Sequence, residues 1–140
     1  MIEIAVNGAC GRMGARIAAL VFEYPELKLV AALERSGNQS IGKDVGLVSG
    51  VGETGIKITM TMNAHADVLI DFSSPESAVA IAEYCARKNI ALVVGTTGLN
   101  AQQHEKIQHF SRQIACLVSP NMSVGVNGLF NLVKKKKKMV

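Results

Sequence analysis

The sequence predicts an α/β domain in which helices cover both faces of a doubly wound parallel sheet. Short apolar runs of strand length alternate with segments of helical periodicity, which is the pattern of repeated strand–helix–strand units. Polar or glycine-rich clusters follow most of the apolar runs. The chain has 140 residues, 49% of them hydrophobic, and therefore fits one domain with one sizeable core better than two.

The first elements are a strand, a helix and a second strand, expected over residues 2–6, 12–21 and 27–33. The helix places Met13, Ile17 and Leu20 at helical spacing. Glycine and polar residues dominate residues 36–55, so we expect a loop there with at most a short strand, followed by a strand around residues 56–62.

The second half of the chain repeats the alternation. Residues 67–72 have the continuous apolar centre of a strand covered on both faces. A helix should follow, with Ser74 as cap, Pro75 at its first position and Glu76 at the positive end of its dipole. Its apolar side consists of Ala78, Val79, Ile81, Ala82 and Cys85. The remaining segments are expected to be a strand, a tight turn, a helix capped by Asn100 and a last strand, over residues 90–94, 95–98, 101–113 and 114–118.

Polar clusters follow the expected strands at residues 8–12, 34–35, 73–74, 95–98 and 119–122. Parallel strands carry their carboxyl ends at one edge of the sheet, and open α/β sheets bind ligands beyond that edge. The chain is therefore expected to bind a ligand there.

The first cluster contains three glycines, Gly8, Gly11 and Gly14, within the stretch VNGACGRMGARI. Glycine permits positive φ and close approach of the backbone, and the free amides at the start of the next helix favour an anion. This arrangement fits a pyrophosphate. The spacing is GxxGxxG rather than the commoner GxGxxG, so a turn that serves only packing is the alternative.

A dinucleotide site also predicts an acidic residue at the end of the second strand, where it accepts hydrogen bonds from the adenosine ribose. Glu34 occupies that position. Arg35 beside it could pair with a 2′-phosphate or stack on the adenine, so the two residues suggest tolerance of both NADH and NADPH. An ordinary solvated charge pair is the alternative.

Composition disfavours several other classes of protein. Cys10, Cys85 and Cys116 are odd in number and far apart, which fits neither a disulfide framework nor a zinc site, and we expect reduced thiols and no metal. The net charge of +4 comes from the run of five lysines at 134–138, since the other ten basic residues face eleven acidic ones. With 4% aromatic residues, no long apolar run and no signal peptide pattern, we expect a cytoplasmic protein without nucleic-acid or membrane partners.

Five motifs, NGACGRMG, ALER, DFSSPE, VVGTTGL and SPNMSVGVN, occur here in an order and spacing that resembles the 4-hydroxy-tetrahydrodipicolinate reductase family, also called dihydrodipicolinate reductases. The likeness reaches about residue 127. It implies a Rossmann-like domain that binds NADPH or NADH, in an enzyme of lysine and diaminopimelate biosynthesis. That enzyme transfers hydride to a cyclic imine-type dicarboxylate, gives tetrahydrodipicolinate, and is a homo-oligomer.

The resemblance also implies roles for individual residues. The pyrophosphate would lie on Gly8, Ala9, Cys10, Gly11, Arg12 and Met13. Glu34 would bind the adenosine ribose, and Arg35 the 2′-phosphate of NADPH. The nicotinamide half would be lined by Gly95, Thr96, Thr97, Ser119, Pro120, Asn121 and Met122, with Phe72 and Ser73 nearby.

The family's second domain, which binds the substrate, has no counterpart in this sequence. Its histidine-rich motif, its lysine and its Gly-Thr segment are missing, and His65, His104 and His109 lie in no such motif, so no catalytic residue is assigned. We expect a dinucleotide-binding domain over residues 1–126 and a helical stub or lysine-rich tail over 127–140. The isolated chain is expected to bind cofactor with little turnover. The alternatives are the nucleotide domain of another dehydrogenase and a non-catalytic nucleotide- or CoA-binding regulatory module.

Overall fold

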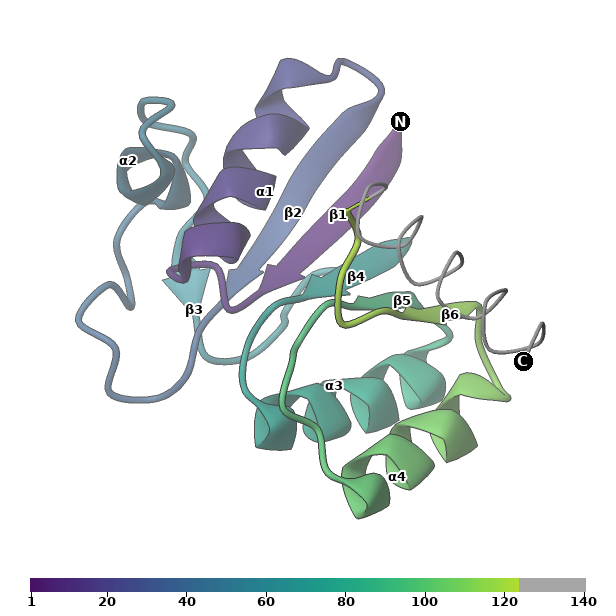
Figure 1. The fold of residues 1–140 in the computed structure, drawn as a ribbon. Coiled ribbons are helices and arrows are strands. Elements are labelled where there is room, and N and C mark those ends of the chain that lie inside the picture. The colour runs from purple at the N-terminus through teal and green to yellow at the C-terminus, as the bar shows by residue number, and fades with distance from the viewer. Residues whose placement is uncertain (124–140) are drawn as a thin grey trace, which may run out of the picture.

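The computed structural model describes residues 1–123, which form a six-stranded sheet with helices on both faces (Figure 1). The elements, in chain order, are β1 (Ile2–Asn7), α1 (Arg12–Glu23), β2 (Leu27–Leu33), α2 (Val45–Ser49), β3 (Ile58–Thr59), β4 (Val68–Asp71), α3 (Pro75–Lys88), β5 (Ala91–Val94), α4 (Ala101–Ser111) and β6 (Cys116–Val118). Each neighbouring pair of strands is parallel. The fold class is thus confirmed. The tail expected over residues 127–140 lies outside the described residues.

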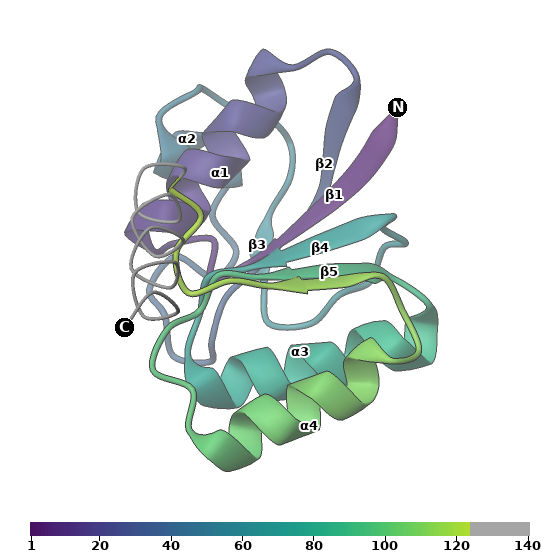
Figure 2. The ribbon, with the colours of Figure 1, turned by 45° about the vertical axis from the view of Figure 1, so that its right-hand side comes forward.

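The strand order is β3-β2-β1-β4-β5-β6, so the chain builds outward from β1 and then restarts on its other side with β4. The carboxyl ends of β1 and β4 are therefore the point where the strand order reverses, and the connections after them diverge. In Figure 2 the loops after β1, β4 and β5 leave the sheet at the same edge. This edge is where the polar clusters of the sequence gather.

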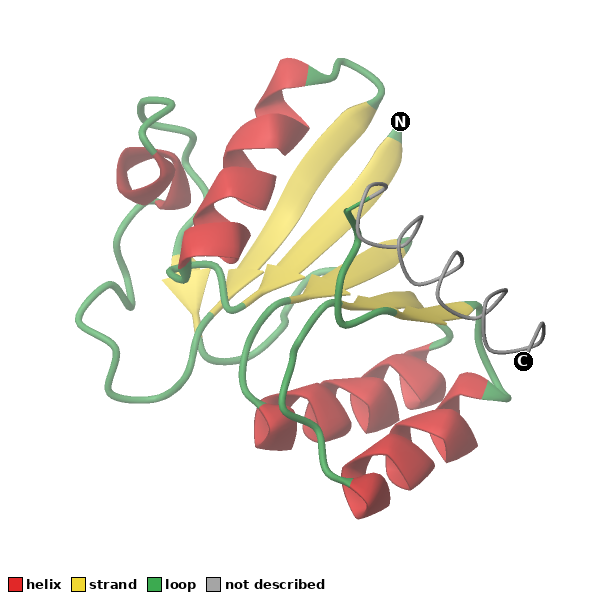
Figure 3. Ribbon diagram, in the orientation of Figure 1, coloured by secondary structure: helices red, strands yellow, loops and turns green. Residues whose placement is uncertain are grey.

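Two apolar clusters hold the layers together. On one face of the sheet, α1 and the segment around α2 pack on alternate residues such as Ile4, Val6 and Leu29. On the other face, α3 and α4 cover residues such as Leu69 and Leu92 (Figure 3). Because both faces are covered, the central strands are apolar on both sides, as the continuous apolar runs predicted.

The buried face of α1 agrees with the expected one only in part. Ile17 packs against the core as expected, but Met13 is 51% exposed, and the most buried residues of the helix are Gly14, Ala18, Ala19 and Val21. A Cβ built on Gly14 would overlap the carbonyl oxygen of Gly8, so the start of the helix lies directly against the loop that precedes it. This close approach selects the small residues of α1 for the buried side and turns Met13 outward, which the apolar spacing alone did not reveal.

The caps of α3 and α4 agree with the sequence. The Ser74 hydroxyl accepts the Ser77 N–H at the start of α3, and Pro75 is the first helical residue. Asn100 and Gln103 form a reciprocal capping box at the start of α4. Since these caps are local, they could be predicted from the sequence.

The loop after β2 contains a short helix, α2, where at most a short strand was expected. Asp44 caps this helix and accepts the Gly46 N–H at 2.8 Å. The same carboxylate accepts the Thr54 hydroxyl at 2.9 Å and the Gly55 N–H at 2.6 Å. Burial acts to raise the pKa of Asp44, but the hydrogen bonds from Thr54, Gly46 and Gly55 outweigh it and lower the pKa below its ordinary value. Asp44 thus closes the loop as an anion.

Replacing Asp44 by Asn should lower the free energy of unfolding near neutral pH, because an NH₂ group would then face the N–H donors of Thr54 and Gly55. A lowered folded-state pKa gives stability that is present above the ordinary pKa and is lost as pH falls through the folded-state value. The difference between wild type and Asp44→Asn should therefore shrink in acid. Urea unfolding followed by circular dichroism at several pH values measures it.

Glu53→Gln is the matched control, since Glu53 is exposed in the same loop. It should leave the unfolding free energy unchanged at each pH. An Asp44→Asn deficit that stays constant into acid would contradict the role assigned to the carboxylate.

Candidate functional site

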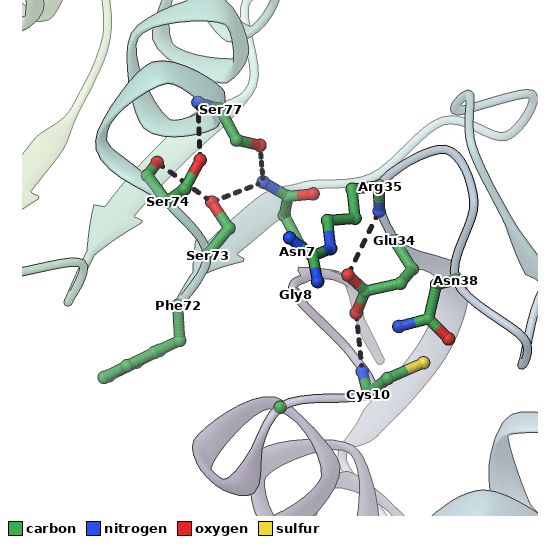
Figure 4. Close-up of a pocket in the computed structure, with 11 residues that line it drawn as sticks. Asn7, Gly8, Cys10, Glu34, Arg35, Asn38, Phe72, Ser73, Ser74 and Ser77 are labelled. Carbon is green, nitrogen blue, oxygen red and sulfur yellow. Dashed lines mark hydrogen bonds between the residues drawn. The ribbon is translucent and has the colours of Figure 1, made fainter.

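Two hollows lie side by side at the carboxyl edge of the sheet. The first, which we call the Glu34 pocket, has a volume of about 310 Å³ and is lined by Asn7, Gly8, Cys10, Gly11, Glu34, Arg35, Asn38, Phe72, Ser73, Ser74 and Ser77 (Figure 4). The second, the Thr96 pocket, has a volume of about 680 Å³ and is lined by Gly11, Arg12, Met13, Phe72, Ser73, Gly95, Thr96, Thr97, Pro120, Asn121, Met122 and Ser123. Gly11, Phe72 and Ser73 line both, so the two pockets adjoin each other, and we call them together the cleft.

The glycine loop forms the floor between the pockets. Gly8 has a φ of +78°, and a Cβ there would overlap the carbonyl oxygen of Phe72. The N–H groups of Gly8 and Ala9 both donate to the Leu33 carbonyl at 3.0 Å, which ties the loop to the end of β2. The loop therefore needs glycine at Gly8 to fit between β2 and β4.

The start of α1 opens toward this cleft. Gly11 is the N-cap, and within residues 1–123 no side chain caps the helix and no acidic residue lies in its first turn. A Cβ at Gly11 would meet Gly8 O at 3.2 Å, and atoms beyond it would enter the cleft that Gly11 lines. The uncapped amides and the space above Gly11 suit a bound anion such as a phosphate.

Glu34 lies at the end of β2 and faces the same loop. Its Oε2 accepts the Cys10 N–H at 3.0 Å, and its Oε1 accepts the Arg35 N–H at 3.1 Å (Figure 4). Glu34 is half-buried and Arg35 is exposed. The carboxylate is thereby held at the rim of the Glu34 pocket, next to the helix end that suits a phosphate.

The Cys10 thiol lies beside this carboxylate. Burial and the nearby charge of Glu34 raise the pKa of Cys10. The thiol is therefore protonated at neutral pH, and its position fits space-filling in the loop rather than a reactive group.

The structure brings nearly all the candidate residues to this cleft. Ala9 belongs to the glycine loop, but its side chain is fully buried and lines neither pocket. Ser119 is half-buried behind the Thr96 pocket, where its N–H donates to the Val94 carbonyl and its hydroxyl to the Asn121 carbonyl. These two residues support the loops whose neighbours line the cleft.

Sequence reasoning missed the buried polar side chains beneath the cleft, Asn7 and Asp71. Asp71 is fully buried, and its carboxylate accepts Asn7 Nδ2, Ser73 Oγ and Thr96 Oγ1, each at 2.6 Å. Asn7 also reaches Ser77 Oγ at 2.9 Å. The available signal was a polar residue at the carboxyl end of each of two apolar runs, β1 and β4. Asn38, Ser74, Ser77 and Ser123 also line the cleft and were not among the candidates.

Other features of the described residues lie away from the cleft. His65, His104 and His109 are exposed and line neither pocket. Within residues 1–123, no three His, Cys, Asp or Glu side chains are placed to hold a metal ion, and no helix is long and apolar enough to cross a membrane. The residues that line the cleft offer backbone amides, hydroxyl groups and the charged groups of Glu34 and Arg35 to a ligand.

The chain resembles known proteins over most of its length. Residues 2–122 match the family model described as dihydrodipicolinate reductase, N-terminus. The chain is 41% identical over 138 residues to 4-hydroxy-tetrahydrodipicolinate reductase of Anaeromyxobacter dehalogenans strain 2CP-1, which covers 96% of this chain and 51% of that protein. It is 40% identical over 137 residues to the enzyme of the same name from Geotalea daltonii, with 96% and 51% covered. The chain thus spans about half the length of these curated relatives.

Solved structures share the fold. A dipicolinate-bound dihydrodipicolinate reductase from Paenisporosarcina sp. TG-14 superposes with a TM-score of 0.67 at 23% identity, over 89% of this chain and 49% of that one. Biliverdin reductase from Synechocystis sp. PCC 6803, in complex with biliverdin and NADP⁺, gives 0.65 at 15% identity, over 84% and 37%. At these identities the likeness shows the Rossmann-like architecture, whereas the family match rests on sequence. The chain belongs to the dihydrodipicolinate reductase family and corresponds to its N-terminal, nucleotide-binding domain.

Proposed function

We propose that this chain binds NADPH or NADH in the cleft and is the cofactor half of a 4-hydroxy-tetrahydrodipicolinate reductase. The observation that carries the proposal is the direct hydrogen bond from the Cys10 N–H to Glu34 Oε2, at 3.0 Å. It joins the anion-binding end of α1 to the carboxylate expected to hold a ribose. Both groups of a dinucleotide site thus face one pocket.

The adenosine side of the cofactor fits the Glu34 pocket. The uncapped amides of the first turn of α1, at Arg12 and Met13, would hold the pyrophosphate. Glu34 would accept the ribose hydroxyls, and the exposed Arg35 would pair with the 2′-phosphate of NADPH. These proposed roles go beyond the family assignment, and substitutions at the named residues can test them.

The nicotinamide side fits the Thr96 pocket. Thr97 and Asn121 line it with polar groups, and a Cβ at Gly95 would overlap the tip of the Phe72 ring, so the end of this ring packs against the turn. Such a pocket offers hydrogen bonds for a carboxamide and one apolar wall for a ring. When bound, the cofactor supplies a hydride to the acceptor carbon and its nicotinamide ring becomes cationic. The residues of this chain would orient the ring for that transfer.

The substrate side of the reaction is assigned to the family's second domain. The proposed acceptor is a cyclic imine-type dicarboxylate that yields tetrahydrodipicolinate, in lysine and diaminopimelate biosynthesis in the cytoplasm. None of the three histidines of residues 1–123 lines the cleft. The isolated chain should therefore bind cofactor and turn over little, because a general acid and a cation for the carboxylates would come from elsewhere.

A Gly11→Asp substitution tests the phosphate site, because the backbone conformation of Gly11 can accommodate Asp. Gly11 is the N-cap with extended backbone angles, so Asp there can cap α1 and the domain should remain folded. Its carboxylate would enter the cleft and repel the pyrophosphate, so NADPH and NADH affinity should fall about 100-fold or more. Isothermal titration calorimetry measures the affinities, with CoA as the competing ligand class.

Gly11→Asn is the matched control, since it has the same shape and capping ability without the charge. It should bind both dinucleotides more tightly than Gly11→Asp does, because it adds the same bulk without the negative charge. Equal affinity of wild type and Gly11→Asp would refute the phosphate site, and a preference for CoA over both dinucleotides would favour the regulatory module.

Arg35→Ala should separate the two cofactors. Its guanidinium is proposed to pair with the 2′-phosphate, so NADPH affinity should fall about tenfold while NADH affinity changes little. Glu34→Gln should weaken NADH more than NADPH, because only the ribose hydroxyls of NADH donate at both positions. Parallel titrations of both variants measure the ratio. If Arg35→Ala weakened the two cofactors equally, Arg35 would not read the 2′-phosphate.

A further inference from the structure

Asp71 is a fully buried carboxylate that none of the cofactor contacts above uses. It ends β4, at the point where the strand order reverses, and three neutral groups donate to it: Asn7 Nδ2, Ser73 Oγ and Thr96 Oγ1. Among residues 1–123 no Lys, Arg or His forms an ion pair with it. An anion at this depth without a cation costs stability, so its presence calls for a role.

The hydrogen-bond pattern fixes the direction of two hydroxyl groups. Thr96 Oγ1 accepts the Ser73 N–H at 2.8 Å, so its one hydrogen is directed to Asp71 Oδ2 at 2.6 Å. Ser73 Oγ lies 2.6 Å from Asp71 Oδ1 and 3.4 Å from the Ser74 carbonyl, so its one hydrogen is directed to the nearer acceptor, the carboxylate. Both hydroxyls therefore point their hydrogens inward, to the carboxylate.

Ser73 and Thr96 both line the Thr96 pocket, so the direction of their hydroxyl groups affects a ligand bound there. With their hydrogens directed at Asp71, these hydroxyls have no hydrogen left to donate to a ligand in the pocket. The anion itself lies one hydrogen bond behind this wall. The wall is thus electronegative where the nicotinamide would lie, and a cationic ring gains more from it than a neutral ring does.

We propose that Asp71 is a positioning residue for the nicotinamide end of the cofactor, acting through the Ser73 and Thr96 hydroxyls and favouring the oxidised, cationic ring over the reduced, neutral ring. The inference rests on the proposed function, because it needs a dinucleotide in the cleft. In this proposal the buried carboxylate raises the affinity for the oxidised cofactor relative to the reduced one. It does not affect the contacts to the phosphates and the ribose.

The ionisation of Asp71 is open to titration. Burial raises the pKa of Asp71, and the hydrogen bonds from Ser73, Thr96 and Asn7 offset part of that rise. The groups that face it from β1, from α3 and from the turns after β4 and β5 are neutral. Among residues 1–123 the Cys85 thiol on α3 is the titratable group that interacts with it, and burial raises the pKa of that thiol to about 12.

Protonation of Asp71 would turn one of the two hydroxyls around. Ser73 Oγ has a second acceptor within reach, the Ser74 carbonyl at 3.4 Å. A neutral side chain at residue 71 would therefore remove the negative charge behind the pocket wall and release the Ser73 hydroxyl toward this second acceptor. Asp71→Asn reproduces this neutral state at any pH.

The test compares three ligands on the 140-residue chain: NAD⁺, NADH and ADP-ribose, which lacks the nicotinamide. In Asp71→Asn, near neutral pH, NAD⁺ affinity should fall about tenfold, as for the loss of one charge interaction. NADH affinity should fall much less, and ADP-ribose affinity should stay at the wild-type value. Isothermal titration calorimetry gives all three constants, and circular dichroism verifies the fold.

Asp67→Asn is the matched control. Asp67 directly precedes β4, its side chain is half exposed at the opposite edge of the sheet, and it accepts the Glu3 N–H. The same substitution there should leave all three affinities unchanged. The comparison separates the loss of a carboxylate next to this strand from the loss of the carboxylate beneath the cleft.

Three outcomes would overturn the inference. Equal losses for NAD⁺ and NADH, or a loss for ADP-ribose as large as that for NAD⁺, would mean that Asp71 only maintains the shape of the cleft. A wild-type chain that binds none of the ligands would refute the proposed function as well.

If Asp71→Asn does not fold, the same inference can be tested on the wild-type chain by measuring affinities at several pH values. The ratio of NAD⁺ affinity to NADH affinity should fall as Asp71 becomes protonated in acid. Any effect of pH on binding of the adenosine half cancels in this ratio, because NAD⁺ and NADH share that half. A ratio that is constant with pH would overturn the inference.

Discussion

The close contact of the glycine loop with its neighbours is the constraint on which the rest of the cleft depends. Gly8 lies against the Phe72 carbonyl, and Gly14 lies against Gly8, with no room for a Cβ at either position. These contacts press the end of β1 and the start of α1 onto the end of β4. Gly11 differs, since a side chain there would project into the cleft. Packing therefore requires two of the glycines, and we propose that the third leaves room for a ligand.

The polar groups at this edge form two layers. Glu34 and the amides of α1 stand at the surface, where they can meet a ligand directly. Asn7 and Asp71 lie beneath, and they hold Ser73 and Thr96 in one arrangement. Because Ser73 and Phe72 line both pockets, the β4–α3 loop links the two halves of the cleft. A buried network that is fully hydrogen-bonded gives this edge a single defined geometry.

The order of strands and helices could be predicted because its signals are local: apolar runs, Pro75 at a helix start, and Asn100 as a cap. The candidate residues at the carboxyl ends followed from that order. What could not be predicted depends on contacts between distant segments. Asp44 caps α2 through the nearby Gly46 N–H, but the same carboxylate also closes the loop through partners ten and eleven residues away, Thr54 and Gly55. The buried face of α1 is set by its contact with the Gly8 loop, and the roles of Asn7 and Asp71 exist only once two strands are paired.

We propose that backbone amides at the start of α1 and the Glu34 carboxylate together bind a dinucleotide. Amide-resolved NMR of the ¹⁵N-labelled chain during NADH titration tests this binding. The largest, saturable shifts are expected at the amides of residues 8–14 and 34–35, with smaller ones at 95–97, and none at the opposite edge around Phe22 and His65. Shifts confined to that opposite edge, or none in the glycine loop at saturation, would contradict it.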